Sequence, residues 1–286
     1  MISDITLGQF FPGYSPLHRL DPRTKILIAI AAIVGIFFAN NPASFFVITL
    51  LALVLIWISR ISFNVIVKGI KPILFILLFT MILNVFMTEG EGEPLVEFWI
   101  IKIYTYGIVR AIFMAWRVVL LIVITSMLLT YTTSPIALTD GLESLLSPLK
   151  KLGVPVHTFA MMMSIALRFI PTLIEETEKI MNAQKSRGAD FSTGSLANRA
   201  RALIPLLIPL IVSSFKRAEE LATAMECRCY RGDKNRTKLV KLVMRPRDYL
   251  WFFLTALSVA LIVVSSILPY NFSGLGIVYD VVFYKI

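Results

Sequence analysis

Residues 43–59 read ASFFVITLLALVLIWIS, an apolar stretch without a single charged side chain. A helix needs about 20 such residues, each rising 1.5 Å, to cross the hydrocarbon of a bilayer. Further predominantly apolar stretches, of which 69–87 and 107–131 include isolated basic residues, occupy residues 26–39, 69–87, 107–131 and 250–268. We therefore predict an all-α integral membrane protein with about five transmembrane helices. Asn40-Asn41-Pro42 is a turn sequence, so the first two helices are expected to form a hairpin.

The composition of the whole chain excludes an ordinary water-soluble fold. Hydrophobic residues make up 57% of the 286 residues and charged residues only 16%, with a mean hydropathy of +0.78. Soluble domains carry about 25% charged residues. The first twenty residues include Asp4, Pro12 and Arg19 in place of an apolar core, so we expect no cleaved signal peptide.

The positions of the charges predict the orientation of the helices. Basic residues flank the helices in segments 1–25 and 59–71, whereas the turn at 40–43 is uncharged and segment 88–104 holds four glutamates against Lys102. Because short cytoplasmic loops are enriched in Lys and Arg, the N-terminus is expected in the cytoplasm and the C-terminus outside. The net charge of +10 is thus interpreted as a topology signal, not as a nucleic-acid surface.

Residues 133–249 form a long insertion between the fourth and fifth predicted spans. It holds 18 of the 28 basic and 11 of the 18 acidic residues, and its apolar stretches at 159–174 and 203–215 each end in a charged run. This pattern predicts a cytoplasmic coupling domain of long amphipathic helices, which Pro171, Pro205 and Pro209 are expected to kink or interrupt. The predicted domains are 1–132 with four spans, 133–249, and 250–286 with the last span and an outer tail.

The insertion contains an approximate internal repeat. Each half has an apolar helix, an acidic patch, and an alanine four positions before an arginine: Ala183 before Arg187, and Ala224 before Arg228. Positions four apart share a helix face, so each alanine leaves room beside its arginine. One Arg-Gly at a helix end is explained by ordinary capping, but two copies with the same spacing favour a functional role.

Three segments resemble the transmembrane T component of energy-coupling-factor (ECF) transporters. They are Leu7 to Lys25, which includes Pro12-Gly13-Tyr14-Ser15-Pro16, then Ala166 to Pro171, and Ser213 to Glu220. The resemblance extends from about residue 5 to 268. It implies the scaffold of an ATP-driven importer that couples two cytoplasmic ABC-type ATPases to a small membrane-embedded substrate-binding S subunit. The opening segment is more similar to scaffolds shared among vitamin-binding subunits than to the dedicated metal-ion type.

The resemblance also implies which residues dock onto the ATPases. In the family, two arginine motifs end two long coupling helices, and they match Ser186-Arg187-Gly188 and Cys227-Arg228-Cys229 here. Together with the two alanines, the candidate docking residues are Ala183, Ser186, Arg187, Gly188, Ala224, Cys227, Arg228 and Cys229. Cys229 replaces the usual glycine, so a glycine-dependent cap is in doubt there and Arg231-Gly232 is the expected helix stop.

A methionine run provides candidates for the contact with the S subunit. Met161, Met162 and Met163 are followed by Ser164, and flexible or small side chains suit a surface that must repack. Contact with the protein core or with lipid explains the same run equally well.

No motif for catalysis or for nucleotide binding occurs in the sequence. There is no G-x-x-x-x-G-K-[ST] loop, no H-E-x-x-H and no G-x-S-x-G, so we expect a non-catalytic subunit whose ATP and Mg²⁺ are held by its partners. The C-x-C of Cys227 and Cys229 has too few ligands for a metal site and is expected to be reduced. The alternative is a self-contained secondary transporter or channel, which should carry polar residues at mid-span and an inverted repeat.

Two arginines lie within the fourth predicted span. Arg110 is expected to reach the outer surface, and Arg117 to find a polar partner inside the bundle, with Asn84 as the candidate.

Overall fold

The computed structural model describes residues 10–88, 96–98, 101–189, 196–230, 232 and 242–267. The chain divides into two compact units. We call the described residues from 135 to 232 the inserted unit, and those of 10–134 and 242–267 the core unit.

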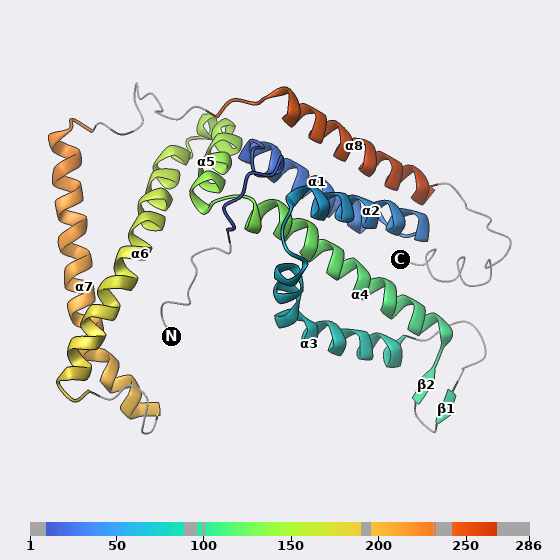
Figure 1. The fold of residues 1–286 in the computed structure, drawn as a ribbon, viewed down its shortest axis with the longest axis horizontal. Coiled ribbons are helices and arrows are strands. Elements are labelled where there is room, and N and C mark those ends of the chain that lie inside the picture. The colour runs from blue at the N-terminus through green and yellow to red at the C-terminus, as the bar shows by residue number, and fades with distance from the viewer. Residues whose placement is uncertain are drawn as a thin grey trace. The chain divides into compact units, whose positions relative to one another are not determined.

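The core unit is built from long helices, shown in Figure 1. They are α1 (Pro22–Phe38), α2 (Pro42–Ser59), α3 (Phe63–Met87), α4 (Thr105–Thr125) and α8 (Pro246–Ile267). A six-residue π-helical segment, η1 (Ser126–Tyr131), continues α4, and a short antiparallel hairpin of β1 (Val96–Phe98) and β2 (Ile101–Ile103) lies between α3 and α4. The α1 and α2 helices each begin with a proline at the first turn, where its missing N–H is tolerated.

The apolar core of this unit lies where α1 and α2 pack against α4 and α8. Its buried side chains include Ile28, Ile36, Ile48, Leu55 and Ile124. The α8 helix comes from the other side of the insertion, so residues far apart in sequence complete one core. The α3 helix packs on α4 and buries only Ile66 of its own residues.

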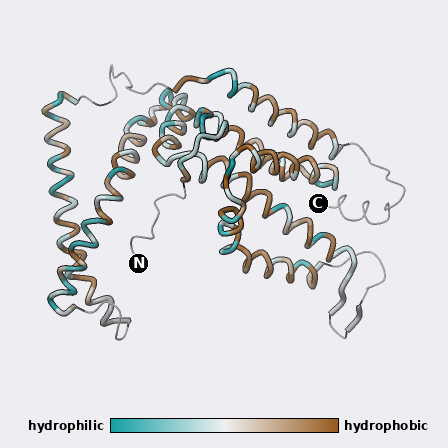
Figure 2. The backbone as a smooth tube through the Cα atoms, in the orientation of Figure 1, coloured by the Kyte–Doolittle hydropathy of each residue, from teal (hydrophilic) through white to brown (hydrophobic). Residues whose placement is uncertain are grey.

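Large apolar side chains remain exposed over much of the core unit. On α3 they include Leu74, Phe75, Ile76, Leu78 and Phe79, and in Figure 2 most of this helix is coloured as hydrophobic. Exposed apolar surface of this extent indicates a lipid environment. Five described helical segments are long and apolar enough to cross a membrane, and the fold class predicted from sequence, an all-α integral membrane protein, is confirmed.

The five segments only partly coincide with the predicted spans. Four of them, Pro42–Ser59, Phe63–Met87, Thr105–Tyr131 and Pro246–Ser266, overlap predicted spans. The fifth is Val156–Ser186, which was predicted to be part of the amphipathic insertion. The predicted span 26–39 overlaps α1, which has 17 residues and is shorter than these five.

The inserted unit consists of two long helices and a short helical entry. The entry is α5 (Pro135–Leu146) followed by the 3₁₀ segment η2 (Ser147–Leu152), and the long helices are α6 (Val156–Ser186) and α7 (Leu196–Cys227). The α6 helix packs against both α5 and α7. Pro171, Pro205 and Pro209 lie inside these helices, which continue past them, so the expected interruption does not occur.

The partner of Arg117 differs from the one predicted. Its Nη2 donates a hydrogen bond of 2.6 Å to the carbonyl of Ala39, and its guanidinium lies 5.5 Å from the ring centre of Phe45. Asn84 instead donates to the carbonyl of Thr80 in its own helix. Arg117 therefore binds the C-terminal end of α1, where a cation complements the helix dipole.

Candidate functional site

The C-terminal end of α6 places the first candidate arginine. Arg187 is the residue that follows the last helical turn, and Gly188 after it adopts a left-handed conformation with φ +89°. The N–H of Gly188 bonds to the carbonyl of Lys185 at 2.9 Å, and that of Ala189 to the carbonyl of Gln184 at 3.0 Å. This pair of bonds is the Schellman motif, which satisfies the free carbonyls at a helix end.

The α7 helix ends in the same motif around the second candidate arginine. The N–H of Cys229 bonds to the carbonyl of Glu226 at 2.8 Å, and that of Tyr230 to the carbonyl of Met225 at 3.0 Å. Cys229 takes the left-handed position with φ +56°, which glycine normally occupies. The expected stop at Arg231-Gly232 is therefore wrong, because α7 ends at Cys227; Arg231 itself lies outside the described residues.

The two helix ends present their arginines in the same way. In both, the arginine follows the last helical residue and is followed at once by the left-handed residue. Within the described residues, neither guanidinium has an ion-pair partner. All of the candidate docking residues are exposed: Ala183, Ser186, Arg187, Gly188, Ala224, Cys227, Arg228 and Cys229. Each end can thus present a forked, planar cation to another protein.

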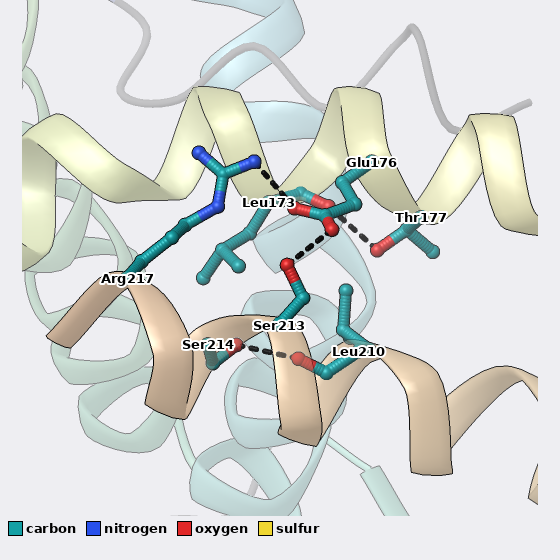
Figure 3. Close-up of polar contacts among 7 residues, drawn as sticks. All are labelled: Leu173, Glu176, Thr177, Leu210, Ser213, Ser214 and Arg217. Atoms are coloured by element: carbon teal, nitrogen blue, oxygen red, sulfur yellow. Dashed lines mark hydrogen bonds and ion pairs between the residues drawn. The ribbon is translucent and has the colours of Figure 1, made fainter. Parts of the chain in front are cut away.

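A polar contact joins α6 to α7 between these ends and the start of the helices. Ser213 Oγ donates to Glu176 Oε1, and Arg217 Nη2 donates to Glu176 Oε2 at 2.7 Å, as Figure 3 shows. Ser213 and Arg217 are four residues apart and so share a helix face. Glu176 precedes Arg187 by eleven residues, and Arg217 precedes Arg228 by the same number. The contact therefore lies about 16 Å along the helix from each arginine.

Sequence reasoning did not find this contact. Glu176 belongs to the acidic patch of the first half of the repeat, and Arg217 follows the apolar helix of the second half. The only signal was that both occupy the same distance from the two repeated arginines. Periodicity places residues on faces but does not say which faces meet.

An apolar groove of about 450 Å³ lies between α5 and α6. Met163, which is 55% exposed, lines it, and Met162 is exposed nearby on α6. Met161 and Ser164 are half-buried. Glu143 also lines the groove, and its Oε1 lies 2.9 Å from Nδ1 of the His157 ring. This contact joins α5 to α6. The remaining lining residues are Pro135, Leu138, Thr139, Leu142, Leu146, Leu149, Val154, Val156, Phe159, Ala160 and Leu167.

Neither cysteine belongs to a metal site in the described part of the chain. Cys227 and Cys229 are free and exposed, and no group of three or more His, Cys, Asp or Glu residues among the described ones could hold a metal ion.

Fold and helix ends together define a multi-pass α-helical membrane protein. Comparison with known proteins narrows this class. The family model described as a cobalt transport protein, CbiQ, matches residues 13–239. The chain belongs to this family, and within it to the transmembrane T components of energy-coupling-factor transporters, as its relatives indicate.

Three relatives named energy-coupling factor transporter transmembrane protein EcfT are close in sequence. The protein from Clostridium kluyveri is 52% identical over 250 residues, covering 87% of this chain and 92% of the relative. That from Acidaminococcus fermentans is 51% identical with the same coverage. That from Bacillus subtilis is 48% identical over 268 residues, covering 94% of this chain and 98% of the relative.

Proposed function

We propose that this chain is the membrane scaffold of an ATP-driven importer, in which it couples two cytoplasmic ABC-type ATPases to a membrane-embedded S subunit. The observation that carries the proposal is the pair of matched helix ends, each with an exposed arginine held by a Schellman motif. The substrate class would be a vitamin or a transition-metal ion bound by the S subunit. The chain would lie in the plasma membrane, with its N-terminus in the cytoplasm and its C-terminus outside.

Each arginine end would dock into a groove on one ATPase. A guanidinium offers five donors in a rigid fork that suits carboxylates and backbone carbonyls. The Schellman motif uses up carbonyls of the last turn and fixes the direction of the chain after it, so the arginine leaves each helix in a defined direction. Two such ends account for two ATPases, and ATP and Mg²⁺ would be held by the ATPases and not by this chain.

The contact between α6 and α7 supports a mechanical role for the pair. Glu176, Ser213 and Arg217 join the helices about 16 Å before each docking arginine. A displacement of one arginine end would therefore act on both helices. The apolar face of α7, with Leu203, Ile204, Leu207 and Ile208 exposed, and Met162 and Met163 on α6 would pass the motion to the S subunit.

Charge reversal at each helix end tests the docking of the ATPases. The chain is co-expressed with the two ATPases and an S subunit, solubilised and captured by a tag. We expect Arg187→Glu and Arg228→Glu each to lower the amount of co-purified ATPase, because breaking a buried charged contact weakens binding by about 30-fold or more. Coupled ATP hydrolysis should fall with it.

Lys185→Glu is the matched control, because Lys185 is exposed on the last turn of α6 and undergoes the same change of charge. It should leave the captured amounts unchanged. Retention of both ATPases by both arginine variants, with unchanged hydrolysis, would rule out docking through these arginines.

A further inference from the structure

A buried polar cluster lies at the start of α1 in the core unit. Lys25 is 1% exposed, and its Nζ donates to the carbonyl of Thr132 at 2.7 Å and to Thr133 Oγ1 at 3.2 Å. Asp21, Asp248, Thr132 and Thr133 are buried as well. Burying a charged group costs free energy unless the group is hydrogen-bonded. The hydrogen bonds of this cluster are therefore needed to keep its charged side chains buried.

One carboxylate of the cluster binds the starts of two helices. Asp248 lies in the first turn of α8, and its Oδ2 accepts the N–H of Arg245 at 2.6 Å. This is the carboxylate half of a capping box. Its Oδ1 accepts the N–H of Asp21 at 2.9 Å, and Asp21 in turn caps α1 by accepting the N–H of Arg23. The N-terminal ends of α1 and α8, which attract negative charge, are therefore linked by the Asp248 carboxylate.

The cluster is placed where the chain enters and leaves the inserted unit. The chain passes from the core unit to the inserted unit between residues 134 and 135, and returns before Leu242. Lys25 binds Thr132 and Thr133, which lie shortly before the first crossing. Asp248 binds Arg245, three residues after Leu242. Both connections are thus attached to the first turn of α1.

The segment before the first crossing is itself irregular. Residues 126–131 form the π-helical segment η1, and the Thr132 and Thr133 hydroxyls both donate to the carbonyl of Leu128, at 3.1 and 2.7 Å. Such segments leave parts of the regular helical bonding pattern unmet and are frequent at functional positions. Lys25 supplies a donor for the carbonyl of Thr132, which the helix no longer uses.

We propose that Asp21, Lys25 and Asp248 form a joint anchor that holds both connections of the inserted unit to α1. A force on the inserted unit would then reach α1 and α8 together, at one point, instead of pulling on one connection at a time. Lys25 and Asp248 are positioning residues in this role. The part of the proposal that concerns transport rests on the proposed function, whereas the joint anchoring does not.

Hydrogen exchange of the full-length chain in lipid nanodiscs tests the joint anchoring without any partner. Peptides covering 126–134 and 242–250 report on the two connections. We expect Lys25→Met to speed exchange at least tenfold in both segments, although the hydrogen bonds of Lys25 Nζ go only to the first and the second meets it only through the charge of Asp248. Asp248→Asn should do the same in both, although it contacts only the second. Lys71→Met, at an exposed lysine of α3, should change neither.

Two results would overturn the anchor. One is that each variant speeds exchange only in the segment that it contacts, and the other is that neither segment changes. Should Lys25→Met speed exchange throughout the core helices, Thr133→Val decides the matter, because it keeps the Lys25 side chain and removes only the Thr133 hydroxyl, which accepts from Lys25 Nζ and donates to the Leu128 carbonyl. It should speed exchange in both segments, and an effect confined to 126–134 would equally contradict the proposal.

In the assembled importer, we expect loss of the anchor to lower substrate uptake without lowering ATP hydrolysis. Lys25→Met should retain the ATPases and hydrolyse ATP, while the substrate taken up per ATP falls at least tenfold. Equal loss of both activities would contradict a role in transmission. Failure of wild-type chain to capture ATPases would count against the proposed function alone, since the exchange results stand without them.

Discussion

Cys229 holds a backbone conformation that residues with a side chain seldom adopt. Its φ of +56° places Cβ close to the following carbonyl, at a cost of about 1–2 kcal/mol for an L-residue. Glycine has no such penalty. We therefore expect Cys229→Gly to stabilise the end of α7 by about 0.5–1 kcal/mol and to leave assembly with partners intact, measured by thermal unfolding and by capture.

Cys227→Gly provides a control of opposite sign. Cys227 is the last residue of α7, where a glycine would destabilise the helix by up to about 1 kcal/mol because of its low helix propensity. The same chemical change two residues earlier should therefore lower the unfolding temperature. Equal effects at the two positions, or a loss of assembly in Cys229→Gly, would mean that the cysteine side chain itself has a role at position 229.

The surroundings of single charged residues could not be predicted from the sequence. Lys25 was counted among the basic residues that mark the cytoplasmic side, but it is one of the most deeply buried side chains. The partner of Arg117 is a backbone carbonyl. Because every residue has such a carbonyl, the sequence does not indicate which one will bind the arginine. The arginines of the two helix ends were found because a repeat and a motif mark them. No motif or repeat indicates a hydrogen-bond partner that is a backbone carbonyl far away in the sequence.

Among the elements, α3 is held close to the end of the π-helical segment. A Cβ at Gly69 would overlap the hydroxyl oxygen of Tyr131, but would lie 3.6 Å from Cζ. Tyr131 is buried, so its ring has little freedom to move away. We expect Gly69→Ala to destabilise the core unit by about 1–3 kcal/mol through overpacking, measured as a lower unfolding temperature in detergent.

Removal of the hydroxyl should relieve this clash. In a Tyr131→Phe background the nearest atom to the new Cβ is at ordinary van der Waals distance, so Gly69→Ala should then cost less than half as much. A cost that is the same in both backgrounds would show that the hydroxyl does not set the spacing of α3 and η1.

Helix existence could be predicted more reliably than helix ends. Long apolar runs made the helices of the core unit evident, because lipid requires them to satisfy their backbone internally. The predicted span 69–87 lies inside α3, which begins six residues earlier at Phe63, because Lys68 interrupts the apolar pattern before residue 69. The end of α7 was placed too late because glycine was taken as the only left-handed residue, whereas Cys229 adopts that conformation. Which helices meet, as at Glu176 and Arg217, could not be predicted.

For the whole molecule, the predicted orientation can be tested with the two native cysteines. Both lie at the end of α7, in the segment expected to be cytoplasmic, and both are exposed. A membrane-impermeant maleimide should therefore not label wild-type chain in intact spheroplasts and should label it after permeabilisation. Lys285→Cys in a Cys227→Ser, Cys229→Ser background should be labelled in intact spheroplasts, because the tail is expected outside.

The opposite pattern, with native cysteines labelled from outside, would reverse the orientation. It would also remove the arginine ends from the side of the membrane where ATP is present, so the coupling function would fail with it.

In the proposed scaffold, the arginine ends of α6 and α7 each hold one ATPase. Native mass spectrometry of complexes purified without nucleotide counts the ATPases bound to each chain. Wild type should carry two, Arg187→Glu and Arg228→Glu one each, and the double variant none, with Lys185→Glu still carrying two. A double variant that keeps both ATPases would contradict docking through Arg187 and Arg228.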